Sequence, residues 1–260
     1  MDWIYLLILV SAGLVIASIL TSILAFRVGA PLLLVFLVVG VVAGEDGLGL
    51  QFDNAEMAYF VGSVALAVIL FDSGFGTRAQ TFRRAAGPSI LLATLGILLT
   101  TLLVGAAARF LFGLPWPHSL LIGAIVSSTD AAAVFFLLRA GGISIYKRVR
   151  SILEVESGSN DPMAIFLTIF FIELILYGSD SGNPLVTFIT GFGQQMGLGL
   201  LAGVIAGYLI VELVNRIDLD EALYPIAVMA AALCVFALTG YLGGSGFLAA
   251  YVAGDATRRA

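Results

Sequence analysis

Charge, cysteine and histidine are all scarce in this sequence. Of its 260 residues 11% are charged, with 12 Lys and Arg against 17 Asp and Glu, and it has one cysteine, Cys234, and one histidine, His118. A single cysteine cannot form an internal disulfide or build a metal site alone. Because the few Lys and Arg residues form no basic cluster, nucleic acid is not expected as a partner.

Apolar residues, in contrast, make up 60% of the chain, whereas soluble domains are nearer half apolar. Runs of about 20 apolar residues recur, and each is long enough to cross about 30 Å of hydrocarbon. The first run, 3–26, is longer than the apolar core of a signal peptide and follows no basic segment, so we expect a retained helix. The sequence therefore predicts an all-α polytopic membrane protein.

About nine membrane-spanning helices are predicted from these runs and from the prolines near several of their starts. An acidic loop, 45–56, separates the second helix from the third. The predicted spans are 3–26, 30–44, 57–73, 86–113, 118–139, 151–177, 185–214, 222–241 and a last one that begins near 245.

The distribution of Lys and Arg predicts how the chain is oriented, because cytoplasmic loops are enriched in both. Basic residues follow the first, third, fifth and seventh predicted spans, and only Arg109 falls near the opposite face. These loops alternate along the chain, so all lie on one side, the cytoplasm, and the N-terminus is predicted outside. The residues concerned are Arg27, Arg78, Arg83, Arg84, Arg139, Lys147, Arg148, Arg150 and Arg216.

Two aspartates, Asp130 and Asp161, lie inside predicted spans. A charge at mid-membrane depth costs several kcal/mol, so such a residue usually faces a cavity and has a function. A structural ion pair is the alternative interpretation of each.

The span around Asp130 contains the string SSTDAAAVFFLL, residues 127–138. Residues 127–130 are all favourable helix N-caps, here placed in the middle of a span, which predicts an interruption and a new half-helix from Ala131. Interrupted helices at mid-membrane present carbonyl oxygens and dipole ends that can bind an ion. Thr129 would offer a hydroxyl or carbonyl ligand, and Asp130 would balance the positive dipole ends.

The next span contains the string LEVESGSNDPMAIFLT, residues 153–168. Pro162 removes an amide donor from this helix and frees the carbonyl of Gly158. Asn160 and Asp161 come just before it, and their oxygens predict a hard site suited to Na⁺, K⁺ or H⁺. A carboxylate held away from bulk water binds a proton more readily, so one site that binds either H⁺ or a cation, never both, is sufficient for antiport.

Glu156 lies four residues before Asn160 and shares its helix face. A buried glutamate without a partner is costly, so we expect a basic partner for it. No Lys or Arg lies inside any apolar run of this sequence. The partner is therefore predicted to lie outside these 260 residues.

The two strings resemble the paired signatures of the NhaP branch of monovalent cation:proton antiporters, most closely the bacterial potassium/proton subgroup. The resemblance extends from GAPLLLVFLVVGVVAGEDG to GGSGFLAAYVAG, nearly the whole chain. It implies a fold of about thirteen helices in two inverted repeats. It also implies that two such chains form a homodimer in the bacterial inner membrane. In that fold the chain would divide into interface and dimerisation helices at 1–85, core transport helices at 86–180, a linking helix at 181–220, and the start of an incomplete second repeat at 221–260.

The resemblance also implies roles for individual residues. Asp161 would bind the ion and the proton, and Asn160 would orient it. Thr129 and Asp130 would form the unwound crossing beside them, with Ser157 as a further ligand. The Asn-Asp pair goes with electroneutral exchange of K⁺, or alternatively Na⁺, for H⁺, without a cofactor and without enzymatic activity.

The sequence departs from the family in length, since it stops after about nine helices. Glu156 matches a family glutamate that pairs with an arginine on a later helix, and that arginine would be absent from this chain. A gene fragment, a frameshift or a split protein would each explain the length. The alternatives to an active antiporter are therefore an inactive truncated remnant or half of a split transporter. A cation channel is a further alternative, although no carbonyl-filter string of the TVGYG kind occurs.

Overall fold

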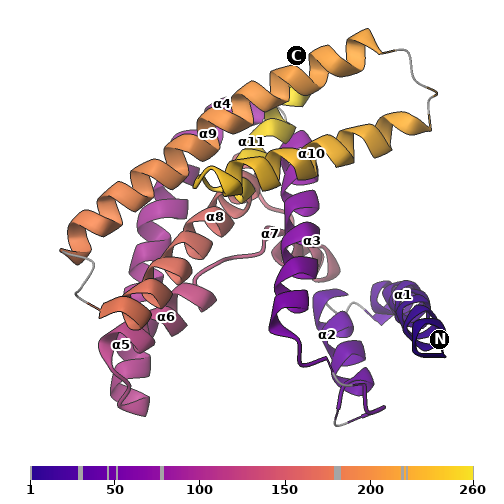
Figure 1. Cartoon of the computed structure of the whole chain (residues 1–260), viewed down its shortest axis with the longest axis horizontal. Helices are drawn as coiled ribbons and strands as arrows, with labels where there is room; N and C mark the ends of the chain where they lie inside the picture. The colour runs from indigo at the N-terminus through magenta and orange to yellow at the C-terminus, as the bar shows by residue number, and fades with distance from the viewer. Residues whose placement is uncertain are drawn as a thin grey trace. The chain divides into compact units, whose positions relative to one another are not determined.

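The computed structural model of the chain is helical. It describes residues 2–28, 32–45, 47–50, 52–76, 79–178, 183–217, 220 and 222–259 (Figure 1). Within these ranges there are helices and no strands, which confirms the all-α fold class predicted from the sequence.

The helices follow one another through short connections. In chain order they are α1 (Asp2–Val28), α2 (Leu32–Ala43), α3 (Ala55–Gly76), α4 (Ala79–Leu91), the π-helical turn η1 (Leu92–Gly96), α5 (Ile97–Phe112), α6 (Trp116–Val126), α7 (Ala131–Ala140), α8 (Lys147–Tyr177), α9 (Pro184–Arg216), α10 (Leu223–Tyr241) and α11 (Gly246–Arg259). Because α4, η1 and α5 run on without a gap, they form one long helix that contains a π-bulge.

Five helices in the described part of the chain are long and apolar enough to cross a membrane: Ala55–Gly76, Ala85–Phe112, Lys147–Tyr177, Pro184–Arg216 and Leu223–Tyr241. Three shorter apolar helices accompany them, Ile8–Ile23, Leu34–Ala43 and Trp116–Val126. Large apolar side chains on the long helices are exposed, for example Phe110 at 82%, and such faces suit contact with lipid. The prediction of a multi-pass membrane protein is confirmed, whereas the count of nine spans stays a prediction.

The predicted span 118–139 consists of two helices. α6 ends at Val126 and α7 begins at Ala131, so the interruption predicted from residues 127–130 is confirmed, including the first residue of the second half. α8, in contrast, passes through Pro162 as one helix.

The chain forms two compact units. The first comprises residues 1–58 and 130–145, and the second comprises residues 59–129 and 146–260. In the first unit α1 packs against α2. The second unit holds two groups of helices, one around α8 and one around α11.

The first group packs α4, η1, α5 and α6 against α8. Its apolar core includes Ile97 of α5, Ala124 of α6, and Met163 and Leu167 of α8. α5 and α6 approach so closely that a Cβ atom at Gly123 would overlap the carbonyl oxygen of Thr101, a small-residue contact typical of membrane helices. This packing fixes α6, and therefore the start of the interruption, against α8.

The second group packs α11 against α9, α10 and α3, and α9 and α11 lie side by side in Figure 1. The α9 face toward α11 carries a glycine at every fourth position, Gly199, Gly203 and Gly207. A Cβ atom at Gly203 would lie 2.7 Å from the carbonyl oxygen of Ala249. The two helices therefore meet backbone to backbone.

Candidate functional site

Side-chain hydrogen bonds mark both ends of the interruption between α6 and α7. Ser127 donates its hydroxyl proton to the carbonyl oxygen of Ala124 at 2.7 Å, and its backbone amide bonds the same oxygen at 3.3 Å. These bonds close the last turn of α6. In the first compact unit, Asp130 Oδ1 accepts a hydrogen bond from the amide of Ala133 at 3.3 Å, so Asp130 is the N-cap of α7.

Thr129, in the interruption, is bonded to α8 through its side chain and its carbonyl group. Its hydroxyl lies 3.0 and 3.1 Å from the two carboxylate oxygens of Glu156, to which it donates. Its carbonyl oxygen accepts from Ser157 Oγ at 3.1 Å and from Asn160 Nδ2 at 3.2 Å. Asn160 Nδ2 also donates to the Thr129 hydroxyl oxygen.

Asn160 connects these groups from a fully buried position, at 0% exposure. Besides its bonds to Thr129, its amide donates to Glu156 Oε1 at 3.0 Å. Glu156 is itself buried, at 7% exposure. A buried polar network of this kind is favourable when its members are satisfied, and it holds the interruption and α8 in one arrangement.

Asp161 lies next to this network and is half-buried. Ser128 donates its hydroxyl proton to Asp161 Oδ1 and lies 3.3 Å from Asn160 Oδ1. Carboxylate, amide, hydroxyl and carbonyl oxygens therefore gather where the interruption meets α8. Oxygen ligands of these kinds suit hard cations, and a carboxylate among them can also take up a proton.

The structure brings together five of the six predicted site residues, and they are Thr129, Glu156, Ser157, Asn160 and Asp161. The sixth, Asp130, belongs to the first compact unit. Sequence reasoning missed Ser128 as a site residue. Its position directly before Thr129, in a run of residues that cap helices, was the available signal.

Glu156 has no Lys or Arg within ion-pair distance among the side chains that the structure describes. The ion pairs described are Arg150 with Glu154 and Arg216 with Glu212. Thr129 and Asn160 supply the donors to Glu156 instead. The basic partner expected from the sequence stays a prediction.

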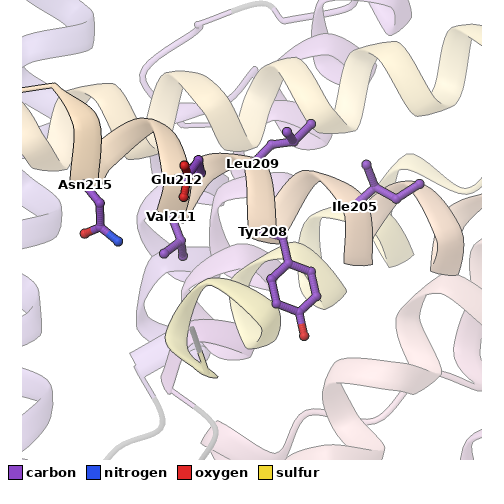
Figure 2. Close-up of a pocket in the computed structure, with 6 residues that line it drawn as sticks. All are labelled: Ile205, Tyr208, Leu209, Val211, Glu212 and Asn215. Carbon is purple, nitrogen blue, oxygen red and sulfur yellow. The ribbon is translucent and has the colours of Figure 1, made fainter.

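A shallow hollow occurs on α9 and is lined by Ile205, Tyr208, Leu209, Val211, Glu212 and Asn215 (Figure 2). All of these residues come from α9, and none belongs to α8 or to the interruption. Glu212 is paired with Arg216 on the same helix. The hollow is therefore separate from the cluster of oxygen atoms around Asp161.

Two helices, one interrupted, that meet at an oxygen-rich cluster agree with the family resemblance seen in the sequence. A family profile described as "Sodium/hydrogen exchanger, transmembrane" matches residues 14–258. The chain belongs to the sodium/hydrogen exchanger family. This membership confirms the resemblance on which the sequence interpretation was based.

Curated relatives of this exchanger-family chain are named as potassium/proton antiporters. It is 44% identical to the K(+)/H(+) antiporter NhaP of Alkalimonas amylolytica over 256 residues, which cover 98% of the chain and 44% of the relative. It is 47% identical to the K(+)/H(+) antiporter NhaP2 of Shewanella sp. (strain ANA-3) over 247 residues, 95% of the chain and 42% of the relative. The chain thus spans less than half the length of either relative.

The fold of this exchanger-family chain is similar to that of a solved structure, the sodium proton antiporter MjNhaP1 from Methanocaldococcus jannaschii. The TM-score is 0.76 and the identity is 24%, and the match covers 97% of this chain and 62% of that one. The similarity confirms the antiporter fold predicted from the sequence.

Proposed function

We propose that the protein exchanges a monovalent cation for H⁺ across the bacterial inner membrane, with K⁺ as the favoured cation and Na⁺ as the second candidate. Family membership over residues 14–258 supports cation:proton antiport. The preference for K⁺ rests on the two relatives that are 44% and 47% identical and bear the name K(+)/H(+) antiporter.

The observation that carries the proposal is the position of Asp161 against an interrupted helix. Asp161 is half-buried on α8 and accepts a hydrogen bond from Ser128, which lies in the interruption. α8 is long and apolar enough to cross a membrane, and a carboxylate inside such a helix normally has a functional role. In the proposed cycle its oxygens bind the cation on one side of the membrane and a proton on the other.

Competition between the two ligands makes the exchange coupled. Since one carboxylate cannot hold a proton and the cation together, release of one ligand is required before the other binds. Asn160 and Thr129 hold the interruption beside Asp161 through their bonds to Glu156. One H⁺ for one monovalent cation moves no net charge, so the exchange is electroneutral.

The proposal includes an arrangement in the membrane. The N-terminus lies outside, and the protein is a homodimer whose dimerisation helices lie within 1–85. Residues 86–180 form the transport core, 181–220 the linking helix and 221–260 the start of the second repeat. In a Cys234→Ser background, an impermeant maleimide added outside the cell should label Asp53→Cys, because the loop 45–56 then lies outside. The solubilised protein should have the mass of two chains.

The experiment that tests the ion site is substitution of Asp161 by Asn, which keeps the size of the side chain and removes its charge. In inverted membrane vesicles, we expect Asp161→Asn to abolish the pH change that K⁺ or Na⁺ produces in the wild type. Glu173→Gln is the matched control, because Glu173 is an exposed residue of the same helix. This control should exchange ions at the wild-type rate.

Wild-type exchange by Asp161→Asn would reject Asp161 as the ion site. Cation flux that follows the membrane voltage, with no coupled movement of protons, would indicate a channel instead. Exchange that responds to an imposed voltage would reject the electroneutral stoichiometry alone.

A further inference from the structure

α8 is enclosed on two opposite sides. One face carries Glu156 and Asn160 and is bonded to the interruption. The opposite face carries Gly158, which lies against α11, and Ile165, which packs on the apolar cluster of α3 and α11. Asp161 borders this second face, because it comes three residues after Gly158 and four residues before Ile165.

The contact at Gly158 is made by the aromatic ring of Tyr251, a residue of α11. A Cβ atom at Gly158 would lie 2.9 Å from Tyr251 Cζ and 3.1 Å from Cδ2, and closer still to Cε2. Ordinary carbon contacts are about 3.5–4.0 Å. The ring edge therefore rests directly on the backbone of α8, in a space that only glycine leaves open.

The ring cannot easily move out of this position. Tyr251 is 2% exposed and shares its apolar cluster with Leu70 of α3 and Phe247 of α11. Its backbone is fixed as well, because a Cβ atom at Gly74 of α3 would overlap the Tyr251 carbonyl oxygen. Close-packed interiors transmit such constraints and do not absorb them. The position of the ring thus limits the position of α8.

We propose that Tyr251 is a positioning residue for the ion site, holding α8 at the distance from the interruption at which Asp161 reaches Ser128. The inference rests on the proposed function and adds a residue that lies outside the oxygen cluster. Gly158 comes three residues before Asp161, so a displacement of the helix at Gly158 moves the carboxylate with it. Ser128 is not displaced with α8, because it comes just after α6 in the chain.

The experiment compares four variants in inverted vesicles: Gly158→Ala, Tyr251→Ala, Tyr251→Phe and the double variant Gly158→Ala with Tyr251→Ala. We expect each single alanine variant to raise the half-saturating cation concentration by roughly tenfold, because a displacement of about 1 Å can cost up to 10²-fold at a positioned site. The maximal rate per inserted protein should change less. Tyr251→Phe keeps the ring and should behave as the wild type.

The double variant should recover part of the loss, because removal of the ring makes room for the new methyl group. Two control variants carry the same substitutions at open positions. A Cβ atom at Gly193 of α9 would have no neighbour within 4 Å among the described residues, and Tyr241 of α10 is 89% exposed. Gly193→Ala and Tyr241→Ala should leave the half-saturating concentration unchanged.

A second readout is independent of transport, namely the rise in thermal unfolding midpoint that K⁺ or Na⁺ gives the detergent-solubilised protein. If the wild type shows no exchange, the proposed function fails. The positioning role is still supported if the cation-induced rise in the unfolding midpoint is smaller in Tyr251→Ala but unchanged in Tyr251→Phe. Equal cation responses in the wild type and both alanine variants would overturn the inference. The inference would also be overturned if the alanine variants differed from the wild type only in the amount of inserted protein, or if the wild type responded to neither cation.

Discussion

At the scale of single residues, Asn160 is the most enclosed polar group of the site. Its amide nitrogen donates to Glu156 Oε1 at 3.0 Å and to the Thr129 carbonyl oxygen at 3.2 Å, and the side chain is 0% exposed. It therefore joins a buried carboxylate of α8 to the backbone of the interruption. An apolar residue in its place would leave both acceptors without this donor.

We predict that Asn160→Ala lowers the free energy of unfolding by about 1–3 kcal/mol, the usual cost of a buried polar group that loses its partner. Thermal unfolding of the detergent-solubilised protein measures this loss. Asn215→Ala is the control, since Asn215 lies exposed on α9, and it should unfold at the wild-type temperature. A variant at Asn160 that is as stable as this control would contradict the role given to the network.

At the scale of helices, the glycines of α9 determine how closely α11 can pack. A Cβ atom at Gly207 would lie 2.9 Å from the carbonyl oxygen of Ala253 and would overlap the Ala256 side chain. Neither neighbour is the flexible end of a side chain, so one helix must move to make room. At Gly197, on the same helix, a Cβ atom would meet none of the described residues within 4 Å.

Gly207→Ala should therefore destabilise the protein by about 1–3 kcal/mol through overpacking. Gly197→Ala should be neutral or stabilise it by up to about 1 kcal/mol, because alanine is the better helix former. Thermal unfolding of the two variants side by side checks the prediction. If both glycines tolerate alanine equally, α9 and α11 do not meet in the way described.

Where the helices end could be predicted from the sequence more easily than which helices pack together. The interruption at 127–130 was predictable because an N-cap side chain accepts from an amide of the following turn, as Asp130 does from Ala133. Ser127 differs from this prediction, since its hydroxyl donates to the Ala124 carbonyl oxygen at the end of α6. The contact between Gly158 and Tyr251 was not, since it depends on which helices are neighbours. Likewise, the glycine spacing on α9 indicates a close helix contact but does not identify α11 as the partner.

At the scale of the whole molecule, fold and family agree over nearly all of the chain. The family profile matches residues 14–258, and the fold is similar to that of the sodium proton antiporter MjNhaP1 with a TM-score of 0.76. The chain spans 42–44% of two curated relatives. Within the second compact unit, the oxygen cluster lies where the group around α8 meets the interruption, and Tyr251 reaches the same helix from the group around α11.

The central claim is that Asp161 binds either a proton or an alkali cation. Proton release on addition of K⁺ or Na⁺ to weakly buffered, detergent-solubilised protein tests it most directly, because binding of a competing cation must displace protons. We expect release by the wild type and by Glu173→Gln, and none by Asp161→Asn. Equal release by the wild type and Asp161→Asn, or no release by the wild type, would contradict it.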